Sequence, residues 1–161
     1  MRKGFTMIEL IFVIVILGIL AAVAIPRLAA TRDDAQVAKI SSNLATVIAD
    51  AGARWTAQGS WPTNWTDLTN VPLQTGLDGG TAASTLAAGT AVYLGTGTTG
   101  KENACYSINL GADGKVTVIG LADGTSPACV AAKKATAANN LSDKTDGTAK
   151  AHTFGGSSVK F

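Results

Sequence analysis

Charged side chains, histidine and cysteine are scarce in this sequence. Only 15% of its 161 residues are charged, whereas a soluble domain usually carries about a quarter. One His and two Cys exclude most zinc and haem sites that need several protein ligands. The net charge of +2 is too small to indicate nucleic acid or an anionic membrane surface as the main partner. With 47% hydrophobic residues, the chain is also too apolar for a disordered protein.

The hydrophobic residues are concentrated near the N-terminus. Between Phe5 and Ala30, 21 of 26 residues are hydrophobic, and no residue from Leu10 to Pro26 is charged. As a helix, the stretch from Phe5 to Ile25 would span about 31 Å, which matches a hydrocarbon core of about 30 Å. The sequence therefore predicts a membrane-inserted N-terminal helix followed by one modest domain.

One interpretation of this segment is a secretory signal that is removed. Met1-Arg2-Lys3 would be its basic start, and Ala22-Val23-Ala24 its cleavage motif. Cleavage after Ala24 would release a secreted periplasmic binding protein that begins at Ile25. Glu9 argues against this interpretation, because it places a carboxylate where a secretory signal should be purely apolar.

The other interpretation uses Lys3-Gly4-Phe5-Thr6-Met7-Ile8-Glu9-Leu10 and the apolar run behind it. This stretch resembles the prepilin signature of type IV pilins and type II secretion pseudopilins. The resemblance implies that a membrane peptidase cleaves between Gly4 and Phe5, and that Phe5 is then N-methylated. Residues 1–4 would be a cytoplasmic leader, held there by two basic side chains. Their removal leaves eleven basic and eleven acidic residues.

Three residues of the predicted transmembrane and assembly segment, residues 5–26, are candidates for assembly. Glu9 is an ionisable group inside a membrane helix, which indicates a function; the alternative is a first-turn acid favoured by the helix dipole. In the family that the sequence resembles, the equivalent Glu meets the N-terminal amine of a neighbouring subunit. Gly18 and Pro26 weaken the helix between them. The resemblance implies that this stretch melts on assembly, with a fixed kink as the alternative.

Beyond Pro26 the apolar residues recur at three- and four-residue steps, as on one face of a helix. These residues are Val37, Ile40, Leu44, Val47, Ile48, Ala51 and Trp55. The predicted helix runs over residues 5–58, and Gly59, directly after it, suits a C-terminal cap. Its second half should therefore pack on a globular domain.

Residues 59–161 predict a small β-rich domain. A short strand is expected at 91–94, and residues 105–110 and 115–119 alternate around Gly111-Ala112-Asp113-Gly114, which indicates a hairpin. The Gly/Ala/Thr-rich stretch 75–100 predicts a surface loop. The alanine-rich stretch 128–140 has a helical composition but poor caps. The expected fold class is α+β, with the long helix packed on a small antiparallel sheet as in pilins.

Cys105 and Cys129 would lie in an oxidising periplasm if the leader is cytoplasmic. Many pilins carry a C-terminal disulfide loop, and this pair resembles it. Two free buried thiols are the alternative.

Other motifs predict no chemistry. Gly95–Lys101 lacks the following hydroxyl residue and helix of a phosphate-binding loop, and the Asp-Gly pairs lack the spacing of a calcium loop. The tryptophans Trp55, Trp61 and Trp65 indicate packing at the helix–domain junction more than a binding platform. We therefore expect neither an enzyme, a metal nor a cofactor.

The sequence is thus interpreted as a structural subunit of a type IV pilus-like filament, with a type II secretion pseudopilin as the alternative. The expected partners are other copies of the chain, the prepilin peptidase and methylase, an inner-membrane assembly platform and minor pilins. Nucleic acid is not expected as a direct partner. The chain would span the inner membrane once, with its C-terminal domain in the periplasm, before it joins a periplasmic or extracellular filament.

Overall fold

The structure is a computed structural model that describes residues 4–77, 85–86, 89–97, 99–143 and 147–154, with the backbone alone at residues 26, 29 and 30. Most of the predicted leader, including Arg2 and Lys3, therefore lies outside the described residues, as does part of the predicted surface loop. By its internal contacts the chain divides into residues 1–35 and residues 36–161, and the division falls within the first helix.

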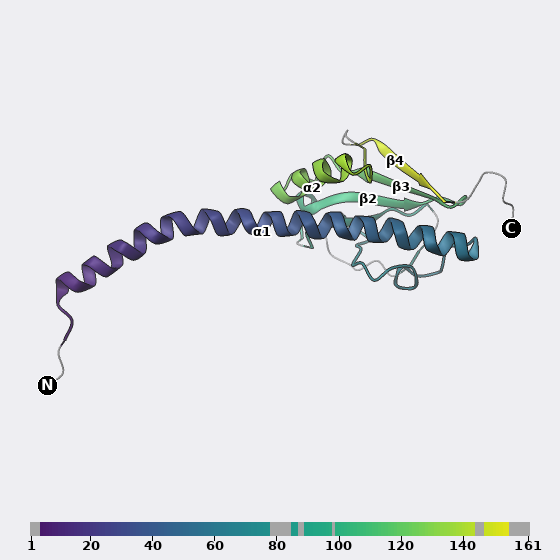
Figure 1. Ribbon diagram of the computed structural model, residues 1–161. Helices are drawn as coiled ribbons and strands as arrows, with labels where there is room; N and C mark the ends of the chain where they lie inside the picture. The colour runs from purple at the N-terminus through teal and green to yellow at the C-terminus, as the bar shows by residue number, and fades with distance from the viewer. Residues whose placement is uncertain (1–3, 78–84, 87–88, 98, 144–146, 155–161) are drawn as a thin grey trace. The chain divides into compact units, whose positions relative to one another are not determined.

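Helix α1 spans Met7–Gln58 (Figure 1). It begins two residues after the predicted start at Phe5, because Thr6 caps the first turn with its hydroxyl. It ends before Gly59, which adopts a φ of 65° and donates its N–H to the Trp55 carbonyl at 2.8 Å. Glycine tolerates this left-handed conformation, so Gly59 closes the helix as the sequence indicated.

A four-stranded antiparallel sheet forms the centre of the unit 36–161. Its order is β1 (Val92–Gly95), β2 (Ala104–Leu110), β3 (Lys115–Gly120) and β4 (Ala149–Thr153). The predicted hairpin is confirmed: β2 and β3 pair from Tyr106↔Gly120 to Leu110↔Val116. The predicted strand at 91–94 corresponds to β1. The fold is α+β and pilin-like, as expected.

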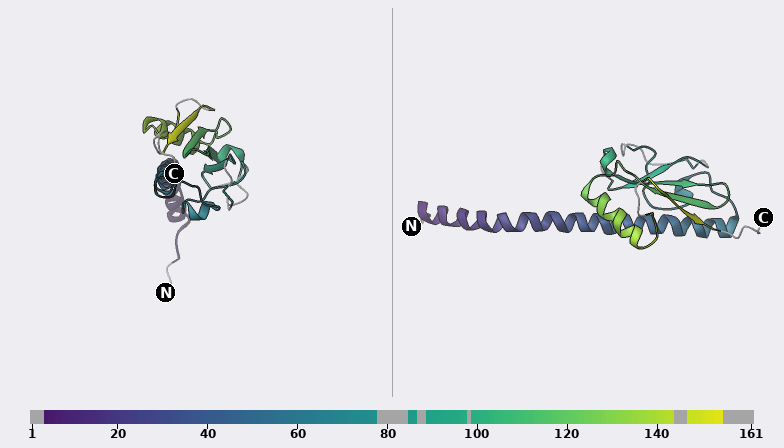
Figure 2. Two further views of the ribbon diagram at one scale, coloured as in Figure 1. Left: turned by 90° about the vertical axis from the view of Figure 1, so that its right-hand side faces the viewer. Right: turned by 90° about the horizontal axis from the view of Figure 1, so that it is seen from above.

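The core of this unit lies between the sheet and the second part of α1, which run alongside each other in Figure 2. The predicted apolar face of the helix is confirmed, because its central residues are fully or almost fully buried. These are Ile40, Leu44, Val47, Ile48 and Ala51. From the sheet they meet the alternate side chains of the strands, chiefly Val92, Leu94, Tyr106, Ile108, Leu110, Val116 and Val118.

Helix α2 (Pro127–Ala138) follows β3 and precedes β4 in the chain, and it packs against β2. The sequence indicated helix here but no good cap, and that part was wrong. Ser126 precedes the helix and its side chain accepts the Cys129 N–H at 3.4 Å, while Pro127 occupies the first turn. Proline suits this position because its missing N–H needs no partner there.

Some elements were not predicted. Strand β4 and the short 3-10 helices η1 (Trp65–Asp67) and η2 (Lys101–Asn103) carry no clear sequence signal. The stretch 75–100 was expected to be a surface loop rather than core, yet Leu86 within it is buried. Thr85, beside it, forms a bridge with Asn64. This backbone pairing places the Leu86 side chain in the core.

Candidate functional site

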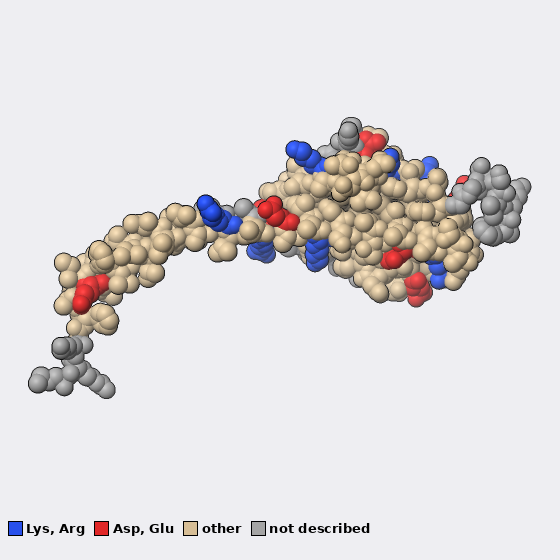
Figure 3. Space-filling model, viewed as in Figure 1, with Lys and Arg blue, Asp and Glu red and all other residues tan. Residues whose placement is uncertain are grey.

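The N-terminal part of α1 is an exposed apolar rod. Met7–Ile25 has a mean hydropathy of 3.1 over 19 residues, long enough to cross a membrane, and none of it is buried. Figure 3 shows almost no charged side chains along it. A soluble surface rarely leaves so large an apolar area in water. This segment fits a single-pass membrane anchor, whose side chains would contact lipid or other helices.

Glu9 and Thr6 cap the first turn of this rod. The Thr6 N–H and hydroxyl both donate to Glu9 Oε2 at 2.8 Å, and the Glu9 N–H donates to Thr6 Oγ1 at 3.3 Å. This reciprocal arrangement is a capping box, which satisfies two backbone donors that an α-helix leaves unpaired at its start. Sequence reasoning singled out Glu9 and missed the role of Thr6. The Thr-x-x-Glu spacing was the signal that could have revealed it.

Both hydrogen bonds that the Glu9 carboxylate accepts from Thr6 go to the same oxygen, Oε2. Glu9 Oε1 accepts no hydrogen bond from the described residues. A carboxylate can accept about four hydrogen bonds, so the second oxygen retains its capacity for an incoming donor. In an apolar segment, the Glu9 carboxylate would attract a positively charged donor, such as an ammonium group, most strongly.

Gly4 and Phe5 lie before the helix in irregular backbone. Phe5 is 88% exposed, and no atom lies within 4 Å of the position that a Cβ would take on Gly4. An extended, exposed chain is the form in which a peptidase can bind backbone. The predicted cleavage and methylation positions are therefore accessible.

Gly18 and Pro26 lie inside continuous helix. α1 is unbroken from Met7 to Gln58, so in the single chain both residues are helical. Space around Gly18 is open, because no atom lies within 4 Å of the point where a Cβ would extend from it. Glycine is thus not required there by packing within the chain. Melting of this stretch on assembly stays a prediction.

Cys105 and Cys129 form a disulfide, so the alternative of two free thiols is excluded. The bond joins the start of β2 to the first turn of α2, with a Cα–Cα distance of 4.9 Å. Both residues are fully buried. The bridge fixes α2 on the sheet at the position where the chain leaves β3.

The structure also places the motifs that were set aside. The segment Gly95–Lys101 leads through the short 3-10 helix η2 into β2 instead of into an α-helix. Among the described residues, no group of three or more His, Cys, Asp or Glu side chains is arranged to hold a metal ion. The one histidine of the sequence, His152, faces the Leu141 carbonyl, 2.9 Å from its Nε2. Trp65 is buried, whereas Trp55 and Trp61 are half-buried beside each other.

A comparison with known protein families gives a match that covers the apolar segment and the first turn of α1. Residues 1–25 match the family described as the prokaryotic N-terminal methylation motif. The match includes Gly4, Phe5, Glu9 and Gly18.

Comparison with individual proteins extends the similarity to pilins. The chain is 51% identical over 45 residues to the type IV narrow pilus major component PilA5 of Thermus thermophilus. The aligned segment covers 28% of this chain and 39% of that relative. No solved structure matches the chain. Together the two matches support a resemblance to the type IV pilin and pseudopilin family, and the aligned relative is a pilus component.

Proposed function

We propose that this chain is the structural subunit of a type IV pilus-like filament. A peptidase of the inner membrane removes residues 1–4, and the new N-terminal Phe5 is methylated. The mature chain is stored in the membrane by residues 5–26, with its C-terminal domain in the periplasm. It then polymerises through the N-terminal helix, with the assembly platform and minor pilins as partners.

The observation that carries this proposal is the coincidence of three features within one helix. The N-terminal methylation motif covers residues 1–25. The same segment is an exposed apolar helix, with its one carboxylate in the first turn. An ordinary membrane anchor needs the apolar length; the acid caps its first turn, but a carboxylate in a membrane helix is costly enough to indicate a further function. A filament core explains both, because apolar helices pack together while the acid pairs with an amine.

The geometry of Glu9 supports a direct role in assembly. Its Oε2 is held by Thr6, which fixes the carboxylate at the start of the helix. Its Oε1 remains available to the N-terminal amine of a neighbouring subunit. Such a pair would neutralise two charges that are both costly in an apolar environment. The neighbour's amine would thereby draw each new subunit to one position along the filament axis.

The decisive experiment is the intact mass and N-terminal residue of the protein purified from native membranes. We expect N-methylated Phe5. A chain that begins at Ile25 would contradict the proposal and support a secreted binding protein, and an uncut Met1 would leave only an anchored protein. A Gly4→Val variant is the matched control: it should keep the leader, because a side chain at this position obstructs the peptidase, while the membrane-bound amount stays the same.

A type II secretion pseudopilin would give the same mature N-terminus. The disulfide-bounded segment favours a pilus, since the sequence resembles pilins that carry such a loop. Electron microscopy of fibres sheared from the cell surface separates the two. Long surface fibres that contain this chain support the pilus, whereas fibres seen only when the chain is overproduced support the pseudopilin.

A further inference from the structure

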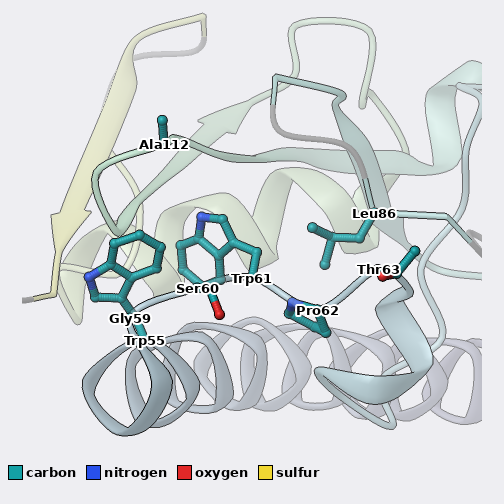
Figure 4. A pocket seen from close by; sticks show the side chains of 8 residues that line it. All are labelled: Trp55, Gly59, Ser60, Trp61, Pro62, Thr63, Leu86 and Ala112. Carbon is teal, nitrogen blue, oxygen red and sulfur yellow. The ribbon is translucent and has the colours of Figure 1, made fainter. Parts of the chain in front are cut away.

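An open cleft lies beside the end of α1, within the unit 36–161. It has a volume of about 450 Å³ and is lined by eight residues, two of which are tryptophans (Figure 4). Trp55 comes from the last turn of the helix, and Trp61 from the segment that follows it. Their ring centroids are 4.8 Å apart with an interplanar angle of 42°. The volume lies within the range of about 300–1,000 Å³ that small-molecule sites occupy.

The two rings are held in place by the β2–β3 turn. Trp61 Nε1 donates to the Gly111 carbonyl at 2.8 Å. Trp55 lies against Gly114, so closely that a methyl group on this glycine would overlap its indole ring. Gly114 has a φ of 70°, which suits glycine. The aromatic surface is therefore fixed before any ligand arrives, which lowers the entropy lost on binding.

The hydrogen-bonding groups of the cleft are neutral, and several have no protein partner. None of the eight lining residues carries a charge. Ser60 and Thr63 are exposed, and their hydroxyls make no hydrogen bond to the described residues. The Trp55 indole nitrogen lies against Gly114, on the side of the ring away from Trp61 in Figure 4, so the two hydroxyls are the open side-chain groups of the lining. The cleft therefore places two open hydroxyls beside a pair of fixed indole rings.

We propose that this cleft binds a neutral carbohydrate. A pyranose ring with equatorial hydroxyls has an apolar face of C–H groups, which packs on an indole ring, and a rim of hydroxyls, which exchange hydrogen bonds with neutral donors and acceptors. The lining offers both kinds of contact and no ion for a charged ligand. A lipid acyl chain would leave the Ser60 and Thr63 hydroxyls unpaired, so it fits the cleft less well. The proposal does not rest on filament assembly.

The test is a titration of the full-length, ¹⁵N-labelled protein with cellotetraose, a neutral β-linked glucan. The protein is kept in lauryldimethylamine oxide, because glucoside and maltoside detergents carry neutral sugars themselves. The chain has three tryptophans, and their indole N–H resonances report on each ring. We expect the Trp55 resonance to shift saturably, with a dissociation constant of about 1 mM or lower, while that of buried Trp65 stays in place.

Variants test whether the shift comes from the cleft. Trp55→Ala should weaken binding about tenfold or more, and the double change Ser60→Ala with Thr63→Val should weaken it several-fold without disturbing either ring. Thr46→Val, an exposed hydroxyl elsewhere on α1, is the matched control and should bind like the wild type. The proposal is overturned if no indole resonance shifts at about 20 mM sugar, if the Trp55 and Trp65 resonances shift alike, or if the Ser60/Thr63 variant binds as well as the control.

Discussion

The Thr136 hydroxyl contacts two other buried hydroxyls, those of Tyr106 and Ser142. Its Oγ1 lies 2.7 Å from the Tyr106 hydroxyl and 2.8 Å from the Ser142 hydroxyl. It also donates toward the Ala132 carbonyl at 3.0 Å, within its own helix. Such a network fixes the orientation of α2, because a shift of the helix would break bonds that water cannot replace in the core.

Thr136→Val should therefore lower the free energy of unfolding by about 1–3 kcal/mol. Valine keeps the shape of threonine but removes a partner from the buried Tyr106 and Ser142 hydroxyls. Urea unfolding of the detergent-solubilised protein, followed by tryptophan fluorescence, measures the change. The control is Thr46→Val, since Thr46 makes the same bond to the carbonyl four residues back but is exposed; a loss there as large as at position 136 would contradict the argument.

Position 95 requires glycine because the backbone of Asn103 approaches it closely, and position 97 because its backbone has a positive φ. The register of β1 and β2 shifts between Leu94 and Gly95, and a methyl group on Gly95 would overlap the Asn103 carbonyl oxygen. Gly97 has a φ of 85° with open space around it. We expect Gly95→Ala to cost about 2–3 kcal/mol and Gly97→Ala about 1 kcal/mol. Equal losses in urea unfolding would show that the backbone contact at Gly95 relaxes freely.

Residue roles were predictable where the signal is local. Gly59 was identified as a helix cap from its own turn, whereas Glu9 was singled out because a carboxylate interrupts an apolar run, and its assembly role stays a prediction. Thr6 was missed although its signal is equally local. The Trp61–Gly111 hydrogen bond joins residues fifty positions apart, and nothing in the residue types indicates that pairing. Such contacts are created by the fold and are not encoded in spacing.

At the scale of elements, the disulfide fixes α2 to β2. The two cysteines are separated by 24 positions. Closing a loop of this length stabilises the folded state by about 3.5 kcal/mol in the chain-entropy model. The bond also ends at Cys129, whose N–H is bonded to the Ser126 cap. The disulfide and the Ser126 cap thus both stabilise the first turn of α2.

Replacing Cys105 and Cys129 together by serine should lower the free energy of unfolding by about 3–4 kcal/mol. Both sites are buried, so Cys105→Ala with Cys129→Ala is a second variant that avoids burying hydroxyls. Urea unfolding with and without reductant measures the effect. Reductant should destabilise the wild type and leave both variants unchanged; a wild type insensitive to complete reduction would contradict the predicted contribution.

Helices and strands could be predicted from the sequence where their apolar residues recur with a clear period. The apolar face of α1 and the β2–β3 hairpin have clear periodicities and were found. Strand β4 alternates only between exposed and half-buried positions, and it is held by backbone pairing with β3 from Lys115↔Thr153 to Ile119↔Ala149. An edge strand of this kind needs no apolar side chains. Its sequence therefore carries little signal, and only the sheet reveals it.

For the whole molecule, the distribution of charge separates two environments along one helix. Glu9 is the one acidic or basic residue of Met7–Ile25, whereas acidic and basic residues resume at Arg27. If residues 1–4 are removed, the side-chain charges of the mature chain balance. In the proposed filament, the single carboxylate would lie in an apolar core and pair with the N-terminal amine of a neighbouring subunit. Filament assembly should therefore depend on Glu9 far more strongly than membrane insertion does.

Glu9→Leu tests this dependence. Leucine is favourable in a membrane helix, so the variant should reach wild-type levels in the inner membrane, while the yield of sheared fibres should fall by about tenfold or more because the pairing partner of the N-terminal amine is lost. Immunoblots of the membrane and fibre fractions measure both quantities. Thr6→Ala would remove the hydroxyl of the capping box and keep the carboxylate, so a milder loss is expected. Asp34→Leu is the matched control, since it removes an exposed acid of the same helix outside the apolar segment. Wild-type fibre yield from Glu9→Leu, or an equal loss from Asp34→Leu, would show that this carboxylate does not direct assembly.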